Sequence, residues 1–354
     1  MLPTAAAGYG TPGVGGSSAA GGGPEYLEEA APARRPLLPG PTISESMIQA
    51  MSHADSSLPP FGGEEARASF PSARVAVLPV PYEATVSYGG GTLHGPEAIL
   101  RASTQVELYD EEMQLEPHRV GVWTDAILPV EGMPGFRANQ VIERRFGELL
   151  DAGKWVVMLG GEHSITPGGV AATCRRIPGL HVVQLDAHAD LRRSFGGDPW
   201  SHACAMARCV ELAPIRAIGI RNYSAEEAEW IHRGIPGYAM VHAREMEGEG
   251  WMERALQGLD GRPIYLSVDL DYFDPSVIPA TGTPEPGGGA WWPTLRFLAA
   301  LFDRARVEAC DVVELAPTPG LHHADFAAAR LVHKLIGFFY RGSSRVLTPG
   351  FPAS

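Results

Sequence analysis

From Arg74 onward, short apolar runs alternate with amphipathic stretches along the chain. The apolar runs are rich in Val, Ile and Leu and are bounded by Gly, Pro and polar residues, which is typical of buried strands. The predicted strands cover residues 74–80, 118–123, 154–160, 181–187, 215–220, 238–243, 263–271 and 306–315. The predicted helices lie near residues 96–104, 138–152, 167–176, 202–212, 224–234, 249–259, 292–304 and 325–340. This alternation predicts βαβ units in a single three-layer α/β/α domain with a mostly parallel sheet.

The first part of the chain lacks this pattern. More than half of residues 1–45 are Gly, Ala or Pro, and a tract of that composition buries too little apolar area to offset the entropy lost on ordering. We therefore predict a disordered extension over residues 1–45, a transition segment with a short helix over residues 46–73, and the folded domain over residues 74–345.

The composition excludes several classes of protein. The formal net charge of −13 argues against nucleic acid or an anionic membrane as the main partner, because both require a basic surface; it suits a cationic ligand. No apolar run approaches the length of about 18 residues that a membrane-spanning helix needs, and the first residues lack the features of a secretory signal. The chain has four cysteines, which are too sparse for a disulfide scaffold and favour reduced thiols in the cytoplasm.

Polar side chains follow three of the predicted strands. One strand runs into a Gly-Gly turn and a histidine, and the other two end in acidic residues spaced two apart, which places them on one side of an extended chain. The carboxyl ends of parallel strands meet at one edge of the sheet, where ligands usually bind. These residues are His163, then Asp186, His188 and Asp190, then Asp269 and Asp271.

Each of these groups alone has an ordinary structural explanation, since a single histidine is often a hydrogen-bonded core residue and an aspartate often caps a helix. Four ionised carboxylates at one place, however, repel one another and cannot stay buried without cations. Two divalent cations would balance them. The abundance of oxygen ligands favours Mn²⁺ over a cysteine-rich zinc site, and a two-metal site can activate water as a nucleophile.

Three motifs carry a resemblance to a known family. GGEHS (160–164), DAHAD (186–190) and SVDLDYFDP (267–275) resemble the signature motifs of the ureohydrolases, which include arginases and agmatinases. The similarity extends to VPYEATVSYGGGT (80–92), HGPEAILRAS (94–103), TGTP (281–284) and DVVELAP (311–317). It implies an arginase-like fold, an agmatinase-like hydrolase with two Mn²⁺ ions, and assembly as a homotrimer or homohexamer.

The resemblance also implies a role for each site residue. The metal ligands would bind two ions, with Asp186 and Asp269 bridging them and Asp190 hydrogen-bonding the bridging hydroxide that attacks the guanidinium carbon. The first ion would be held by His163, Asp186, Asp190 and Asp269, and the second by Asp186, His188, Asp269 and Asp271.

Two further residues resemble catalytic groups of the family. Glu314 corresponds to the glutamate that binds the guanidinium NH₂ groups; its ordinary alternative is an exposed carboxylate at a strand end. His202 corresponds to the histidine that shuttles protons to the leaving amine; its alternative is a helix residue behind an N-cap at Ser201. Thr281 and Thr283 resemble loop residues near the site, and plain turn residues explain them equally well.

Two positions depart from the family pattern. Leu93 stands where many bacterial relatives carry Arg, which bears on subunit contacts and subfamily. Glu162 stands where arginases and many agmatinases carry Asp, next to a predicted ligand, so metal affinity could shift while the ligand set survives.

The loop LRRSFGGDPWS (191–201) narrows the choice of possible substrates but does not identify one. It lacks the Asn with which family arginases hold an α-carboxylate, which argues against arginine. Asp198 could receive the ammonium group of agmatine, whereas Arg192 and Arg193 would suit a carboxylate-ended compound such as guanidinobutyrate. Agmatine, cleaved to urea and putrescine, is our first candidate; aminopropylagmatine and free guanidine, the latter with Ni²⁺, stay open.

Two other classes of protein are alternatives to a ureohydrolase, a phosphoesterase and a non-catalytic homologue. A phosphoesterase would use a similar oxygen-rich site but would need basic side chains for phosphate, which Glu314 would oppose. A non-catalytic, metal-stabilised homologue would be expected to lack a ligand or His202, and all of these residues are present.

Overall fold

In the computed structural model, residues 58–347 are described, the last four of them as backbone only. The disordered extension and the short helix predicted upstream lie outside the described residues. Within the described part, no helix is both long and apolar enough to cross a bilayer.

Eight strands of the described chain form one sheet in which all neighbouring strands are parallel. They are β1 (Val75–Val80), β2 (Val122–Thr124), β3 (Trp155–Gly160), β4 (His181–Leu185), β5 (Ile215–Ile220), β6 (Tyr238–His242), β7 (Pro263–Asp269) and β8 (Arg306–Val313). Their order across the sheet is β2-β1-β3-β8-β7-β4-β5-β6.

Helices connect the strands. They are α2 (Gly95–Ser103), α3 (Gly135–Asp151), α4 (Thr166–Cys174), α5 (Ala205–Cys209), α6 (Ala225–Arg233), α7 (Trp251–Leu256), α8 (Trp291–Arg304) and α9 (His322–Leu347). Short 3₁₀ turns supplement them: η1 (Glu64–Ala66), η2 (Thr92–His94), η3 (Pro117–Val120), η4 (His163–Ile165), η5 (His202–Cys204), η6 (Ala243–Glu245) and η7 (Leu270–Tyr272).

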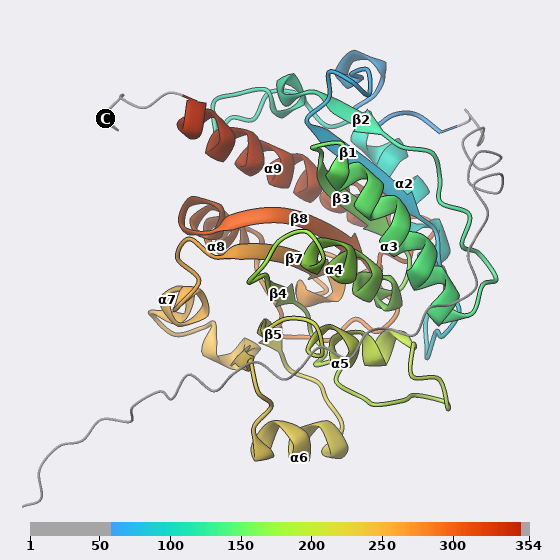
Figure 1. The fold of residues 1–354 in the computed structure, drawn as a ribbon, viewed down its shortest axis with the longest axis vertical. Helices are drawn as coiled ribbons and strands as arrows, with labels where there is room; N and C mark the ends of the chain where they lie inside the picture. Colours follow the sequence, from blue (N-terminus) through green and yellow to red (C-terminus); the bar gives the residue numbers. More distant parts are fainter. Residues whose placement is uncertain (1–57, 348–354) are drawn as a thin grey trace, which may run out of the picture. The chain divides into compact units, whose positions relative to one another are not determined.

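Helices lie on both sides of the sheet (Figure 1), and the buried apolar side chains form two hydrophobic cores, one on each face. Successive side chains of a strand point to opposite faces, so Val75 and Val77 of β1 pack in the core with α2, α7, α8 and α9. Ala76 and Leu78 pack in the other core with α3, α4 and α5. Strands β1 and β3 are buried along their whole length, which explains why they appear as continuous apolar runs in the sequence. The predicted three-layer α/β/α fold with a parallel sheet is confirmed.

Several predicted elements are shorter than expected, among them the strand predicted over 118–123 and the helix predicted over 202–212. Residues 118–123 were predicted as one strand, but Pro117–Val120 form η3 and β2 starts only at Val122. Gly121 turns the chain between them with a φ of 82°, a left-handed conformation that glycine adopts at little cost. The helix predicted over residues 202–212 was too long, because η5 and α5 end at Cys209.

Asp274 and Asp325 do not act as helix N-caps. Asp274 caps a turn instead of a helix: its carboxylate accepts hydrogen bonds from Ser276 N at 3.0 Å and from Gly287 N at 2.8 Å, which joins the two ends of a loop. Asp325 lies inside the first turn of α9, since that helix already begins at His322. Both cases follow from the ability of an aspartate to bind backbone N–H groups in turns as well as at helix starts.

Candidate metal centre and active site

The strand order brings four polar strand ends together. Strands β3, β8, β7 and β4 are direct neighbours in the middle of the sheet. His163 follows β3 after a short turn, Glu314 follows β8, Asp269 ends β7, and Asp186 follows β4. Residues far apart in the sequence therefore meet at one edge of the sheet, as the predicted parallel strands require.

The turn after β3 depends on a glycine. A Cβ atom on Gly161 would lie 1.9 Å from the carbonyl oxygen of Tyr82, so no other residue fits there. The close approach lets Gly161 N donate to Val80 O at 3.1 Å, and Glu162 N donate to Tyr82 O at 2.9 Å. The segment that precedes His163 is thus tied to the segment that follows β1.

His163 faces three carboxylates. Its Nδ1 atom lies 3.1 Å from Asp186 Oδ2, 2.9 Å from Asp190 Oδ2 and 3.3 Å from Asp269 Oδ2. All four side chains are buried, yet Nδ1 makes a hydrogen bond with none of these oxygens. A buried imidazole nitrogen without a hydrogen bond, aimed at several carboxylate oxygens, is an arrangement that fits a divalent cation.

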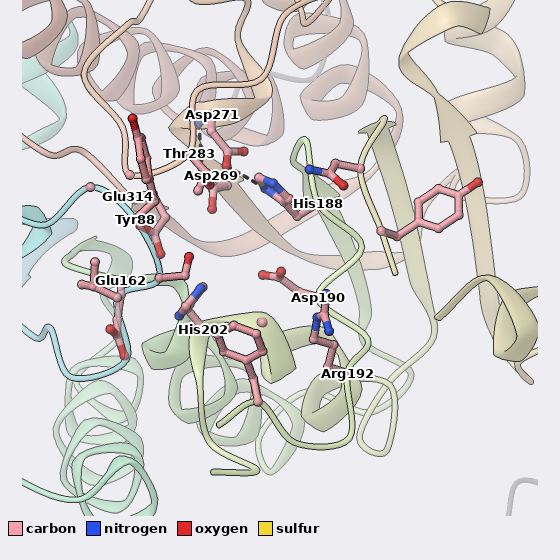
Figure 2. A pocket seen from close by; sticks show the side chains of 18 of the residues that line it. Tyr88, Glu162, His188, Asp190, Arg192, His202, Asp269, Asp271, Thr283 and Glu314 are labelled. Carbon is pink, nitrogen blue, oxygen red and sulfur yellow. Dashed lines mark hydrogen bonds and ion pairs between the residues drawn. The ribbon is translucent and has the colours of Figure 1, made fainter. Parts of the chain in front are cut away.

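A second cluster adjoins the first. His188 Nδ1 lies 2.8 Å from Asp271 Oδ2 (Figure 2). The same nitrogen lies 3.8 Å from Asp186 Oδ1. His163, Asp186 and Asp190 offer ligand atoms that lie within 4.8 Å of one another, and so do Asp186, His188 and Asp271. Because Asp186 belongs to both groups, two metal ions held here would be neighbours.

The charges of this cluster need compensation. Among the protein groups alone, burial and the charges of Asp190 and Asp271 raise the pKa of Asp186 to about 7. Burial, and then the charges of Asp271 and Asp186, raise the pKa of Asp269 well above its usual value. These two carboxylates therefore keep a proton to higher pH than a free aspartate does unless cations replace the protons, which is the behaviour expected of a metal site.

Asp190 and Glu314 share an uncommon backbone conformation. Their φ angles are 51° and 66°, in the left-handed region that non-glycine residues seldom adopt. Backbone hydrogen bonds hold both residues, from Ala207 N to Asp190 O at 3.0 Å and from Glu314 N to Gly161 O at 2.8 Å. Such backbone strain gathers at functional sites, where the surrounding structure enforces it.

A buried chain of hydrogen bonds lies behind His163. Its Nε2 atom is 2.9 Å from Ser267 Oγ, and Ser267 Oγ donates to Asp311 Oδ1 at 2.7 Å. Tyr265 OH donates to the other Asp311 oxygen at 2.8 Å. Since the single hydroxyl proton of Ser267 goes to the carboxylate, Ser267 accepts a hydrogen bond from Nε2–H of His163. This tautomer leaves Nδ1 of His163 as the free ligand atom.

His202 lies on the other side of the site. Its Nδ1 atom is 3.0 Å from Thr85 Oγ1, and its backbone N donates to the same oxygen at 3.0 Å. The ring packs edge-on against Phe195, with ring centroids 5.8 Å apart. Ser201 is the N-cap residue of η5, but its side chain makes no capping hydrogen bond.

One cavity joins these groups. It has a volume of about 210 Å³. Figure 2 shows Glu314, Asp269, Asp271, His188, Asp190 and His202 around it. Toward the outside it is lined by Tyr88, Phe195, Arg192, Asn222 and Tyr223. Of the two loop threonines, Thr283 lines the cavity, whereas Thr281 is buried and is not among its lining residues.

Four of the six predicted ligands line this cavity together with His202 and Glu314: they are His188, Asp190, Asp269 and Asp271. The other two, His163 and Asp186, are buried against them. Sequence reasoning missed Thr85, Ser267 and Asp311, which hold the site from behind. Ser267 and Asp311 begin two of the quoted motifs, and Ser267 shares a strand face with Asp269 by two-residue spacing. That spacing was the available signal for Ser267, whereas Thr85 lies in the quoted segment 80–92 but has no spacing that links it to the site.

A parallel α/β fold with a buried carboxylate and imidazole cluster at the carboxyl edge of its sheet defines a metallohydrolase-type site. The sequence pattern of the arginase family matches residues 73–337. The chain is 41% identical over 288 residues to an N(1)-aminopropylagmatine ureohydrolase of a Synechocystis species, covering 79% of this chain and 93% of the relative. It is 32% identical over 275 residues to an agmatinase of Bacillus anthracis, covering 76% and 92%.

A solved structure of an agmatine ureohydrolase has the same fold as this chain. The agmatine ureohydrolase of Thermoplasma volcanium superposes with a TM-score of 0.74 at 28% identity, covering 85% of this chain and 99% of that one. The chain belongs to the arginase family. The resemblance to ureohydrolases of the agmatinase type is confirmed, and so is the prediction of a hydrolase that acts on carbon–nitrogen bonds of linear amidines.

Proposed function

We propose that this protein hydrolyses a guanidino-alkylamine to urea and an amine, with N1-aminopropylagmatine as the first candidate substrate and agmatine as the second. The observation that carries the proposal is the position of Glu314 beside the carboxylate and imidazole cluster, on the wall of a cavity with an aromatic outer part. Sequence analysis ranked agmatine first. The 41% identical relative named for aminopropylagmatine favours the longer compound.

The proposed ligand set follows the two clusters. His163, Asp186, Asp190 and Asp269 would hold one ion, and Asp186, His188, Asp269 and Asp271 the other. Manganese is our first choice, because six of the eight ligand positions in this scheme are carboxylates and two are imidazoles; nickel is the alternative. When bound, such a pair of ions supplies an activated water that can attack an electrophilic carbon.

Glu314 would orient the substrate. Its Oε1 atom accepts a hydrogen bond from His163 N at 2.6 Å, which fixes the carboxylate next to the cluster. Burial and the charge of Glu162 raise the pKa of Glu314 well above its usual value, so a bound guanidinium would favour the ionised form. A planar guanidinium pairs well with a carboxylate through two parallel hydrogen bonds. This pairing would hold the reactive carbon toward the metal-bound side of the cavity.

His202 would donate a proton to the leaving amine. It lines the cavity, and an imidazole suits proton transfer near neutral pH. Without that proton the amine would leave as an unstable anion, so the reaction requires a proton donor near the leaving nitrogen.

The outer cavity favours an ammonium tail over a carboxylate. The guanidinium of Arg192 stacks on Phe195 at 5.2 Å, and its Nε atom lies 3.8 Å from Glu227 Oε2, so its charge is partly balanced. Tyr88 and Tyr223 add aromatic faces that can attract an alkylammonium chain. These contacts argue against guanidinobutyrate. Asp198, our earlier candidate for the ammonium, instead accepts from Trp200 N at 2.8 Å and is not among the lining residues.

The test is urea release from a substrate panel by the full-length protein, first with Mn²⁺ and then with Ni²⁺. The panel contains N1-aminopropylagmatine, agmatine, arginine, guanidinobutyrate, guanidinopropionate and guanidine. We expect the highest kcat/KM with N1-aminopropylagmatine and little urea from arginine or guanidinobutyrate. Urea from no compound would support the non-catalytic reading, and phosphatase activity without urea would support the phosphoesterase reading.

His202→Ala serves as an internal check of the mechanism. Removal of a general acid lowers turnover by about 10²- to 10⁴-fold, while the bound metal measured by elemental analysis should match that of the unmodified protein. A joint loss of metal and activity would show that His202 supports the metal site instead.

A further inference from the structure

Thr85 stands between Glu162 and His202. Its hydroxyl oxygen lies 2.9 Å from Glu162 Oε1 and 3.0 Å from His202 Nδ1, and it also accepts a hydrogen bond from His202 N at 3.0 Å. Three partners thus surround one hydroxyl group. A hydroxyl offers one proton and two lone pairs, so the direction of each hydrogen bond can be worked out.

Thr85 donates its hydroxyl proton in a hydrogen bond to Glu162. Glu162 accepts four hydrogen bonds, from the backbone N of Ala84 and Thr85 at 2.9 and 2.8 Å, and from the hydroxyls of Thr85 and Ser164 at 2.9 and 2.6 Å. A carboxylate can only accept, and hydrogen bonds to a charged group are the stronger ones. The two lone pairs of Thr85 are then left for His202, one for its backbone N–H and one for Nδ1–H.

We propose that Glu162 and Thr85 are positioning residues that fix a proton on Nδ1 of His202, so that Nε2 is the atom that exchanges protons with the cavity. The inference rests on the proposed proton-donor role of His202 and deepens it. In Figure 2 the His202 ring lies between Glu162 and the carboxylates of the metal cluster. The neutral ring takes up a proton at Nε2, and the charged ring returns it from the same atom to the amine nitrogen.

The arrangement assigns Glu162 a role in addition to the one expected from the sequence. As the residue before a predicted metal ligand, Glu162 was expected to influence metal affinity. Its carboxylate also binds the loop segment Ala84–Thr85, which continues into cavity-lining Val86 and Tyr88. Glu162 therefore holds the wall of the cavity and, through Thr85, the tautomer of His202.

Two pairs of variants test the proposal in the metal-loaded, full-length protein. Thr85→Val keeps the shape but removes the hydroxyl, whereas Thr85→Ser keeps the hydroxyl. We expect Thr85→Val to lower kcat by about 10- to 100-fold, part of the effect of a general acid, with KM changed less than about threefold. Thr85→Ser should recover most of the lost turnover. Thr104→Val, on the surface near the end of α2, is the matched control.

Glu162→Gln tests the direction of the hydrogen bonds. Its amide NH₂ can donate to Thr85 and Ser164, while its carbonyl oxygen still accepts from the Ala84 and Thr85 backbone. Thr85 then becomes the donor to Nδ1 of His202, which reverses the neutral tautomer without removing a contact. Glu162→Asp keeps the acceptor character and is the matched control. We expect Glu162→Gln to lower kcat more than Glu162→Asp at equal metal content.

A second readout does not depend on catalysis. ¹⁵N NMR of labelled histidine reports which ring nitrogen carries the proton. The signals of His202 are assigned by their absence from the spectrum of His202→Gln. The protein is loaded with Zn²⁺ or Mg²⁺, because these ions are diamagnetic. We expect Nδ1–H in the unmodified protein and Nε2–H in Glu162→Gln. If no substrate yields urea but the tautomers are as expected, the proposed function fails and the positioning role stands. The same tautomer in both proteins, or equal kcat for Thr85→Val and Thr85→Ser, would overturn the inference.

Discussion

Replacing Ser267 by alanine should weaken metal binding without touching a proposed ligand. Ser267 is fully buried in β7, where it links Nε2 of His163 to Asp311. The substitution removes the acceptor of the His163 N–H group and one of the donors to Asp311. Tyr265 still donates to the second Asp311 oxygen at 2.8 Å, so the carboxylate keeps part of its support.

The size of the effect follows from the two buried groups that lose a partner. Each buried polar group left without its hydrogen bond costs about 1–3 kcal/mol, so the unfolding free energy should fall by about 2–6 kcal/mol. His163 also loses the contact that fixes its orientation and tautomer, and loss of such a contact usually lowers metal affinity by about 10- to 100-fold. A tenfold weaker site contributes about 1.4 kcal/mol less stabilisation at a fixed, saturating metal concentration.

Urea-induced unfolding of the metal-free and Mn²⁺-loaded proteins separates the two effects. Ser267→Ala should lower the midpoint in both states and should also reduce the additional stabilisation that Mn²⁺ provides. Ser72→Ala is the matched control, because Ser72 is exposed and bonds only within a surface turn. If the metal dissociation constant and the Mn²⁺-induced stabilisation of Ser267→Ala equal those of Ser72→Ala, the account of how His163 is oriented is wrong.

Three further predictions concern charge. Asp186→Asn should abolish nearly all urea release and lower metal content, because Asp186 faces both clusters; full metal occupancy by elemental analysis would contradict this. Without bound cations the pKa of Asp186 is raised to about 7, so Mn²⁺ binding should release protons below pH 7 and should become tighter as the pH rises. Calorimetry in buffers of different ionisation enthalpy measures this proton release. Equal Mn²⁺ affinity at pH 6 and pH 8 would refute the prediction. Lys334→Met should destabilise the fold by about 3–5 kcal/mol, because it leaves buried Asp110 without the ammonium at 2.8 Å; an unchanged urea midpoint would show the pair to be unimportant.

The sequence contains the strands and the ligands but not the order in which the strands lie. Apolar runs predicted all eight strands, and two-residue spacing predicted that Asp186 and Asp190 share a side of the chain. The placement of β8 and β7 between β3 and β4 depends on packing across the whole sheet. It is this order that brings Glu314 beside His163, and no local pattern records it.

The missed residues illustrate the same limit. Thr85 and His202 are 117 positions apart, and Ser267 and Asp311 are 44 apart. A threonine in a loop and a serine in a buried strand are ordinary at the level of sequence, and only their partners reveal a role. The error in the strand predicted over 118–123 has another cause, since turns and 3₁₀ segments use the same residue types as strands.

The proposed metal ligands are oriented by the backbone as well as by one another. Asp186 Oδ1 accepts from His188 N at 2.6 Å, Asp269 Oδ1 accepts from Asp271 N at 2.9 Å, and Asp271 Oδ1 accepts from Ala187 N at 3.1 Å. In each case one oxygen binds a backbone N–H group and the other, Oδ2, faces a histidine of the cluster. Because the fold fixes these rotamers, little ordering entropy remains to be lost when cations bind. The fold holds the carboxylates together against their mutual repulsion, which is the property that the proposed binding of divalent ions requires.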